Sequence, residues 1–219
     1  MTDLTKAQSS RREKTLLTSL LLSAPGPLVT GIAVVTSRAT TQIADFIRRG
    51  MELVAIVIAW WVFRRLHRNN AVDEAERARL ERAAGLSTAG AMAGSGAILM
   101  GLALSRLSAF EPGGSVTMGL TIAVLGAIAN GALWRRYTVL TREQHNPVIA
   151  SQQQLYRAKT VVDLCVVTAL AAVALAPDHP ATRYVDIVGS VSVACYLLWT
   201  GLRTAQPHLL GTKEELKGA

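Results

Sequence analysis

The residues that build disulfide scaffolds and thiol-ligated metal sites are scarce in this sequence. Only two cysteines occur among 219 residues, Cys165 and Cys195, and they lie in apolar stretches without CxxC spacing. Cysteines of this kind are typical of inert core positions and argue against a disulfide framework. The histidines are equally sparse, and no two of them have the spacing of metal ligands. They are His67, His145, His179 and His208.

Motifs for nucleotide chemistry are missing as well. The chain has no phosphate-binding loop, no nucleophile elbow and no dinucleotide-binding glycine pattern, so we expect no cofactor. The lack of histidines with metal-ligand spacing likewise predicts no metal. The net charge is +8, but only 5% of the residues are aromatic and the arginines stand between apolar blocks. A basic surface with interleaved aromatics is therefore absent, and no nucleic-acid partner is expected.

Long apolar blocks are what the sequence does contain. Half of the residues are apolar, and blocks of this length are typical of helices that cross a lipid bilayer. The pattern predicts an all-α integral membrane protein with six transmembrane helices. They cover about 15–36, 43–63, 86–106, 116–136, 153–176 and 182–203. We expect a short basic N-terminus (1–14), a transmembrane domain (15–210), a tail (211–219) and no soluble domain.

The first apolar block is open to two interpretations. Basic residues followed by LLTSLLLSAPG resemble a signal peptide, but the apolar run continues through residue 36 without a clear cleavage site, which favours a first span. Pro25, Gly26 and Pro27 predict a kink or break near its middle. A second local feature, Asn146-Pro147, predicts a turn before the fifth span. Between the second and third spans, 71–85 predicts a short, solvated, charged helix.

Basic residues alternate between the two sides of the predicted bundle. Most of them fall in the N-terminus, the 64–85 loop, the 135–150 loop and the C-terminus. The opposite side carries only Arg38, Arg106 and Arg183. The positive-inside rule therefore places both termini in the cytoplasm and the protein in the cell membrane. The third span is rich in glycine (Gly90, Gly94, Gly96, Gly101), which favours close helix approach and leaves room for a homodimer.

One face of the second span, 42–63, is charged although the segment is otherwise apolar. Asp45, Arg48, Arg49 and Glu52 share the spacing i, i+3, i+4 and i+7, which places them on one side of a helix. Each such charge costs roughly 2.5–3.5 kcal/mol to insert near the bilayer centre. The face can form internal ion pairs at i, i+4 (Asp45 with Arg49, or Arg48 with Glu52), can line a site, or can do both.

These features together resemble the transmembrane half of the cation diffusion facilitator family. The run Ala44-Asp45 to Glu52 is similar to the family pattern A-D-x-x-H/D-x-x-x-D on span two. NPVIASQQQLYRAK resembles the approach to the second H-x-x-x-D, and Asn130 matches a common asparagine of span four. The charged 73–86 loop, Asp186 and residues 200–203 extend the resemblance over most of 15–211. It implies a six-helix bundle in which spans two and five carry paired metal ligands.

The ligand positions themselves depart from the family pattern. The resemblance places Arg48 and Glu52 in the ligand positions of span two, and in span five either Leu155 and Lys159 or Lys159 and Asp163. Zinc requires His, Cys, Asp or Glu ligands, and an arginine stays protonated and repels a cation. Ordinary zinc transport is therefore not expected from this site.

Spans two and five are expected to face each other, which would gather a cluster of mixed charge. We expect acid or catalytic roles for Asp45, Arg48, Glu52, Lys159 and Asp163, and substrate binding by Arg49, Gln152, Gln153 and Tyr156.

Three functions remain open for such a cluster. The first is a membrane enzyme resembling diazotases that join nitrite to an aryl amine, with Arg48, Arg49 or Lys159 holding nitrite and a carboxyl acting as general acid. The second is a transporter of cations, or a proton-coupled carrier of another small solute. The third is a non-catalytic membrane partner. In each case the lipid bilayer is a partner.

Overall fold

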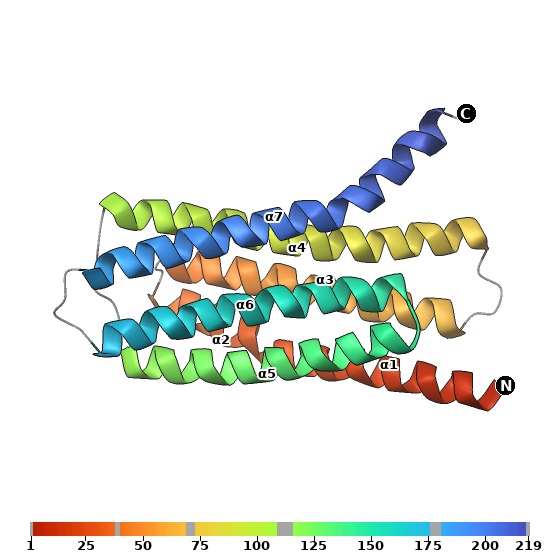
Figure 1. Cartoon of the computed structure of the whole chain (residues 1–219), viewed down its shortest axis with the longest axis horizontal. Coiled ribbons are helices and arrows are strands. Elements are labelled where there is room, and N and C mark those ends of the chain that lie inside the picture. Colours follow the sequence, from red (N-terminus) through yellow and green to blue (C-terminus); the bar gives the residue numbers. More distant parts are fainter. Residues whose placement is uncertain (1, 38–39, 69–72, 109–115, 176–180, 218–219) are drawn as a thin grey trace.

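The computed structural model describes residues 2–37, 40–68, 73–108, 116–175 and 181–217. Helices account for nearly all of these residues, and the bundle that they form is shown in Figure 1. The helices are α1 (Thr2–Ser23), α2 (Pro25–Ser37), α3 (Thr40–Arg68), α4 (Glu74–Ser108), α5 (Val116–Glu143), α6 (Pro147–Leu175) and α7 (Ala181–Lys217). The all-helical class expected from the sequence is confirmed.

The break predicted in the first apolar block is present. α1 ends at Ser23 and α2 begins at Pro25, with Ala24 in a turn whose amide still donates to the carbonyl of Leu20 at 2.9 Å. Pro25 lacks an amide hydrogen and its ring clashes with the preceding turn, so a straight helix cannot pass through it. Proline is well suited to the first turn of the next helix, and α2 therefore begins at this residue.

The turn predicted at Asn146-Pro147 is also present and caps α6. The side-chain oxygen of Asn146 accepts hydrogen bonds from the amides of Val148 (3.1 Å) and Ile149 (3.2 Å), which have no partner within the helix. Pro147 occupies the first helical position. α6 thus starts earlier than the predicted span and includes Gln152, which lies just outside that span, as a helical residue.

The charged segment 71–85 differs from the prediction. From Glu74 onward it belongs to α4, one continuous helix that runs to Ser108, instead of forming a short helix of its own. No proline or glycine separates Glu74 from the apolar part before Gly85, so nothing in the sequence stops the helix. The extension remains largely exposed, as predicted, and carries the exposed ion pair of Arg77 with Glu81 at 3.4 Å.

The basic segments gather at one end of the bundle. In Figure 1 the start of α1, the α5–α6 turn, the start of α4 and the end of α7 all lie at the end marked by N and C. The alternation of basic residues along the chain thus becomes a basic end in space. Its placement in the cytoplasm stays a prediction of the positive-inside rule.

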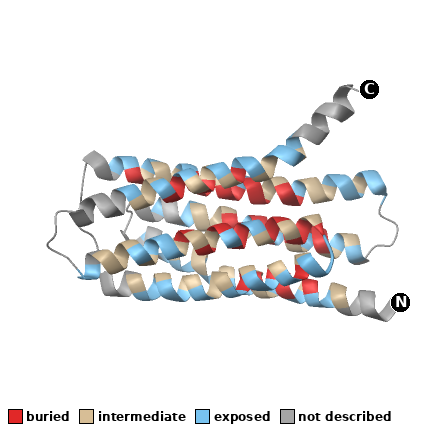
Figure 2. Ribbon diagram, viewed as in Figure 1, coloured by how far each residue is buried: buried red, intermediate tan, exposed pale blue. Residues whose placement is uncertain are grey.

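Buried residues occupy the middle of the bundle and the half nearer the termini, whereas the described residues of the opposite half are mostly exposed or intermediate (Figure 2). Large apolar side chains are exposed along α2, with Val35 at 79% and Leu28 at 69%. By length and composition, two stretches of the described chain are apolar enough to cross a membrane, Gln8–Ile32 and Glu74–Ser105. An apolar exterior of this extent suits a lipid environment.

The two cysteines correct one expectation. Cys165 and Cys195 are free and exposed, so neither is a core residue. The apolar segments around them misled the prediction, because in a lipid-exposed helix an apolar neighbourhood does not distinguish the inside of the bundle from the outside.

Glycine packing is confirmed only for part of the third span. A Cβ on Gly96 would lie 2.8 Å from the amide nitrogen of Leu198 on α7, and one on Gly94 would lie 2.9 Å from the Met51 side chain on α3. At Gly90 and Gly101 a Cβ would meet no described atom within 4 Å. These two positions leave part of α4 open, and the homodimer stays a prediction.

Candidate functional site between α3 and α6

An ion pair joins α3 to α6 near the middle of both helices. Lys159 Nζ lies 2.9 Å from Glu52 Oε2, and the two side chains are only 16% and 12% exposed. Arg48, one turn before Glu52 on α3, approaches the other carboxylate oxygen at 4.0 Å and is 20% exposed. A single carboxylate therefore stands between two cationic side chains in a largely dehydrated part of the bundle.

Local sequence explains why these groups meet. Arg48 and Glu52 are four residues apart, so helical periodicity puts both on one face of α3. Ala55, Ile56 and Ala59 continue that helix as fully buried residues and hold it against the core. On α6, Leu155, Tyr156 and Ala158 are buried and fix the rotation of the helix, which directs Lys159 toward α3.

A layer of hydroxyl groups lies beside the ion pair. Lys159 Nζ is 5.3 Å from the centre of the Tyr156 ring, close enough for a cation–π contact. Tyr156 stacks on Tyr137 of α5 with ring centres 5.4 Å apart. The two phenols share hydrogen bonds with α1, from Tyr137 OH to Ser19 Oγ at 2.8 Å and from Tyr156 OH to Ser23 Oγ at 3.2 Å. The layer thus connects the ion pair to the end of α1.

Asp163 lies one turn beyond Lys159 and faces a different helix. Asn130 on α5 donates a hydrogen bond from Nδ2 to Asp163 Oδ2 at 2.7 Å. A Cβ on Gly126 would lie 3.4 Å from the same oxygen, so glycine leaves the space that this carboxylate occupies. Lys159, Arg48 and Glu52 remain its electrostatic neighbours. Asn130 therefore bridges α5 and α6.

The predicted cluster is therefore only partly assembled. Arg48, Glu52, Tyr156 and Lys159 come together, and Asp163 stands next to them. The side chain of Asp45 lies outside the described part of the chain.

Three other predicted members point elsewhere. The amide of Gln152 donates to Thr88 of α4 at 3.1 Å, and that of Gln153 donates to Thr138 of α5 at 3.1 Å, so both glutamines bridge helices away from the ion pair. Arg49 lies against α2, where a Cβ on Gly26 would be 3.3 Å from its guanidinium, and its charge still acts on Glu52.

Sequence reasoning missed the hydroxyl layer. Ser19 and Tyr137 are fully buried, yet neither was proposed as part of the site. The available signal was a polar side chain inside an apolar run, which in a membrane segment must find a partner. Thr15 and Thr88, which are also fully buried, follow the same rule.

The arrangement favours neutralisation of charge by the protein itself. A divalent cation bound by Glu52 would lie beside an ammonium and a guanidinium, neither of which can act as a ligand in its charged form. Within the described residues, no three His, Cys, Asp or Glu side chains converge so that they could hold a metal ion. Lys159 instead fills the position opposite Glu52.

Comparison with known proteins places the whole bundle in one family. A family model described as the cation efflux transmembrane domain matches residues 16–210, which is most of the chain. The match includes both members of the ion pair, the Asn130–Asp163 contact and the hydroxyl layer. None of the curated proteins compared with this chain matches it.

Proposed function

Because this chain belongs to the cation diffusion facilitator family, whose transmembrane domain spans residues 16–210, we propose that it is a membrane transporter with an atypical site. In this proposal the ammonium group of Lys159 is a tethered cation that takes the place of a bound metal. A small cation from solution competes with it for Glu52. The transporter function was the second interpretation of the sequence, and the family match supports it over the enzyme.

The contact between Lys159 and Glu52 carries this proposal. With Lys159 protonated, the charges of Arg48, Glu52, Lys159 and Asp163 sum to zero and Arg49 adds a further positive charge that acts on Glu52, so the site does not attract another cation. Loss of one proton from Lys159 lowers the net charge of the site by one, and binding of one monovalent cation restores it. Exchange of one proton for one monovalent cation therefore keeps the charge of the site constant.

The charges around Lys159 favour one of the two registers for span five. Leu155 is 1% exposed and part of the apolar core, whereas Asp163 is an electrostatic neighbour of Lys159, Arg48 and Glu52. We therefore assign Lys159 and Asp163, not Leu155 and Lys159, to the functional pair. Asp163 then supplies the second negative charge, and Asn130 orients it by hydrogen bonding.

Flux into sealed proteoliposomes tests the proposal. With an imposed pH gradient, the wild type should carry sodium or potassium, and zinc flux should be weak or absent. Glu52→Gln should abolish the monovalent flux, because it removes the carboxylate that alternately holds Lys159 and the cation. Lys159→Met should uncouple any remaining flux from the pH gradient. Arg77→Gln, which breaks an exposed ion pair on α4, is the matched control.

Two results would contradict this function. One is strong zinc flux that survives Lys159→Met, which would show that the ion pair is not the transport site. The other is the absence of any cation flux from folded wild-type protein over a range of pH gradients.

A second candidate is nitrite-dependent diazotisation. It is supported by Arg48 and Lys159, which occupy two of the positions where the family pattern has metal ligands. An aryl amine, one nitrite ion and two protons would give an aryl diazonium ion and two molecules of water. Arg48 and Lys159 would bind the anion, and Asp163 would deliver protons.

The test of the second candidate uses detergent-solubilised protein, nitrite and an aminophenol, with the diazo product followed by mass. Product formation without any ion gradient, lost in Arg48→Ala and retained in Arg77→Gln, would establish the enzyme. A product rate equal to that of protein-free buffer would exclude it.

A further inference from the structure

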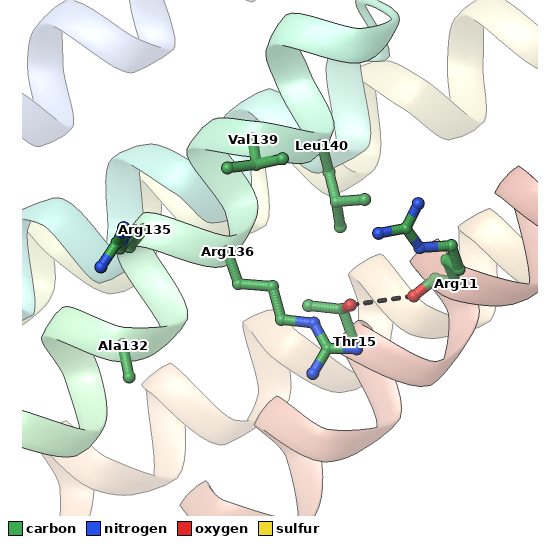
Figure 3. Close-up of a pocket in the computed structure, with 7 residues that line it drawn as sticks. All are labelled: Arg11, Thr15, Ala132, Arg135, Arg136, Val139 and Leu140. Atoms are coloured by element: carbon green, nitrogen blue, oxygen red, sulfur yellow. Dashed lines mark hydrogen bonds between the residues drawn. The ribbon is translucent and has the colours of Figure 1, made fainter.

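A basic pocket lies between α1 and α5 at the end of the bundle that carries the termini. Arg11 and Thr15 of α1 and Ala132, Arg135, Arg136 and Val139 of α5 line it. Figure 3 shows the side chain of Arg136 extending from α5 to Thr15 and that of Arg11 extending from α1 toward Leu140. This pocket is separate from the Glu52–Lys159 ion pair.

The pocket carries more positive charge than its surroundings neutralise. Arg11 has an ion pair with Glu143, but at 3.8 Å and with the arginine side chain 65% exposed this contact is weak. Among the described residues, Arg135 and Arg136 have no ion-pair partner, and both are exposed. Arg12, next to Arg11, is turned inward and donates to the carbonyl oxygens of Leu140 and Gln144. A phosphate group would neutralise the positive charge of these arginines, which the protein itself does not fully balance.

The position of the pocket matches that of a lipid headgroup. Thr15 and Arg136 stand at the predicted ends of the first and fourth spans, where the bilayer changes from hydrocarbon to headgroups. One and two helical turns further into the predicted membrane, Ile128 (64% exposed) and Leu125 (62%) continue the face of α5 that bears Ala132. The face is thus basic at the boundary and apolar beyond it.

We propose that this pocket binds the phosphate of an anionic phospholipid, with an acyl chain of that lipid lying along Leu125 and Ile128. A basic pocket between transmembrane helices on the cytoplasmic side is suited to such headgroups. Lipid bound here would join α1 to α5. It would thereby support the helix that carries Ser19, the partner of Tyr137 in the hydroxyl layer.

Native mass spectrometry of the full chain in detergent tests the proposal, with phosphatidylglycerol and phosphatidylcholine as probes. We expect preferential binding of phosphatidylglycerol by the wild type. Arg135→Gln with Arg136→Gln should weaken it about 30-fold, because each basic residue near an anionic lipid contributes to its attraction. Ala132→Trp keeps every charge and fills the pocket, and it should also reduce binding.

The matched control is Arg77→Gln with Arg79→Gln, which removes the same charge from an exposed part of α4 at the same end of the bundle. Equal losses in the two double variants would overturn the proposal, because they would indicate general attraction to a basic surface. Displacement of the lipid by millimolar inorganic phosphate would overturn it too, since the site would then recognise a free anion. Retained binding in Ala132→Trp would place the lipid elsewhere. None of these outcomes depends on transport.

Discussion

Two helix pairs in this bundle are held together by opposite means. α4 and α7 approach so closely that a Cβ on Gly201 would lie 2.6 Å from the amide nitrogen of Ala93, and one on Gly96 would lie 2.9 Å from the carbonyl oxygen of Ala194. α3 and α6 are instead joined through the long side chains of Glu52 and Lys159 at 2.9 Å. Backbone contact gives a fixed interface, whereas an ion pair between flexible side chains can open and admit another charge.

The comparison indicates where movement is possible. Separating α4 from α7 would lose van der Waals contacts between small residues. Lipid is as apolar as these side chains, so exposure to it would not compensate for the lost contacts. Between Glu52 and Lys159, separation is costly only while both groups stay charged and unpaired. We therefore expect α4 and α7 to act as the frame, and α3 and α6 to form the part whose contacts change during transport.

The largest effect is expected from breaking the ion pair on one side. Lys159→Met leaves Glu52 as a largely buried carboxylate without its nearest cation, and should lower the free energy of unfolding by about 3–5 kcal/mol. Thermal unfolding in detergent is the measurement. The double variant Glu52→Gln with Lys159→Met should recover most of this loss, because the buried carboxylate is removed together with the ammonium group that neutralised it. A double variant as unstable as the single one would contradict this account.

A smaller loss is expected at the second polar contact of α6. Asn130→Leu removes the donor that lies 2.7 Å from Asp163, and a hydrogen bond to a charged group contributes about 1.5–3 kcal/mol. Reversible unfolding in detergent should show a loss in this range, and Asp163→Asn added to Asn130→Leu should reduce it. Thr168→Val, which affects an exposed hydroxyl on the same helix, is the control. Equal stability of Asn130→Leu and wild type would mean that the carboxylate finds another partner.

The close packing of α4 against α7 is tested by adding one methyl group at their interface. Gly201→Ala should cost about 1–3 kcal/mol, because the new Cβ meets the backbone of α4 and the helices must separate. Gly101→Ala, on α4 with no described atom within 4 Å of its Cβ, should instead stabilise the helix by roughly 0.5–1 kcal/mol. If Gly201→Ala and Gly101→Ala changed the unfolding temperature equally, the result would contradict close backbone packing between α4 and α7 at Gly201.

The smallest expected effect is a pH dependence of stability caused by His208, which lies on α7 at the end of the bundle that carries the termini. His208 follows the predicted sixth span, and partial burial together with the nearby charge of Arg82 lowers the pKa of this imidazole below the 6.5 of a free side chain. The unfolded chain therefore takes up a proton first as pH falls. Stability should be unchanged above pH 6.5 and decline below it, through the folded-state pKa.

Unfolding temperatures at pH 8 and pH 5 measure this dependence. His208→Gln should lose part of the decline, whereas His145→Gln, at an exposed position in the α5–α6 turn, should keep it. A decline of equal size in His208→Gln and wild type would assign the effect to other groups.

Much of the fold could be predicted because it depends on local chemistry. Apolar blocks, the Pro25 break and the Asn146-Pro147 turn each depend on residues close together in the chain, and each is present in the structure. The site was harder to predict. Arg48, Glu52 and Lys159 were recognised as neighbours through the family resemblance, but Gln152 and Gln153 were placed with them and instead bind Thr88 and Thr138.

The sequence alone determined which residues form helices, which charges share a helical face and which ends of the helices are basic, because a period of 3.6 residues fixes these relations within each segment. Only the tertiary structure decided how each helix is rotated against its neighbours. That rotation joined Lys159 to Glu52, turned Asp163 toward Asn130 and left Cys165 and Cys195 exposed. Packing of small residues and buried polar groups between helices sets the rotation, and those contacts join residues far apart in the chain.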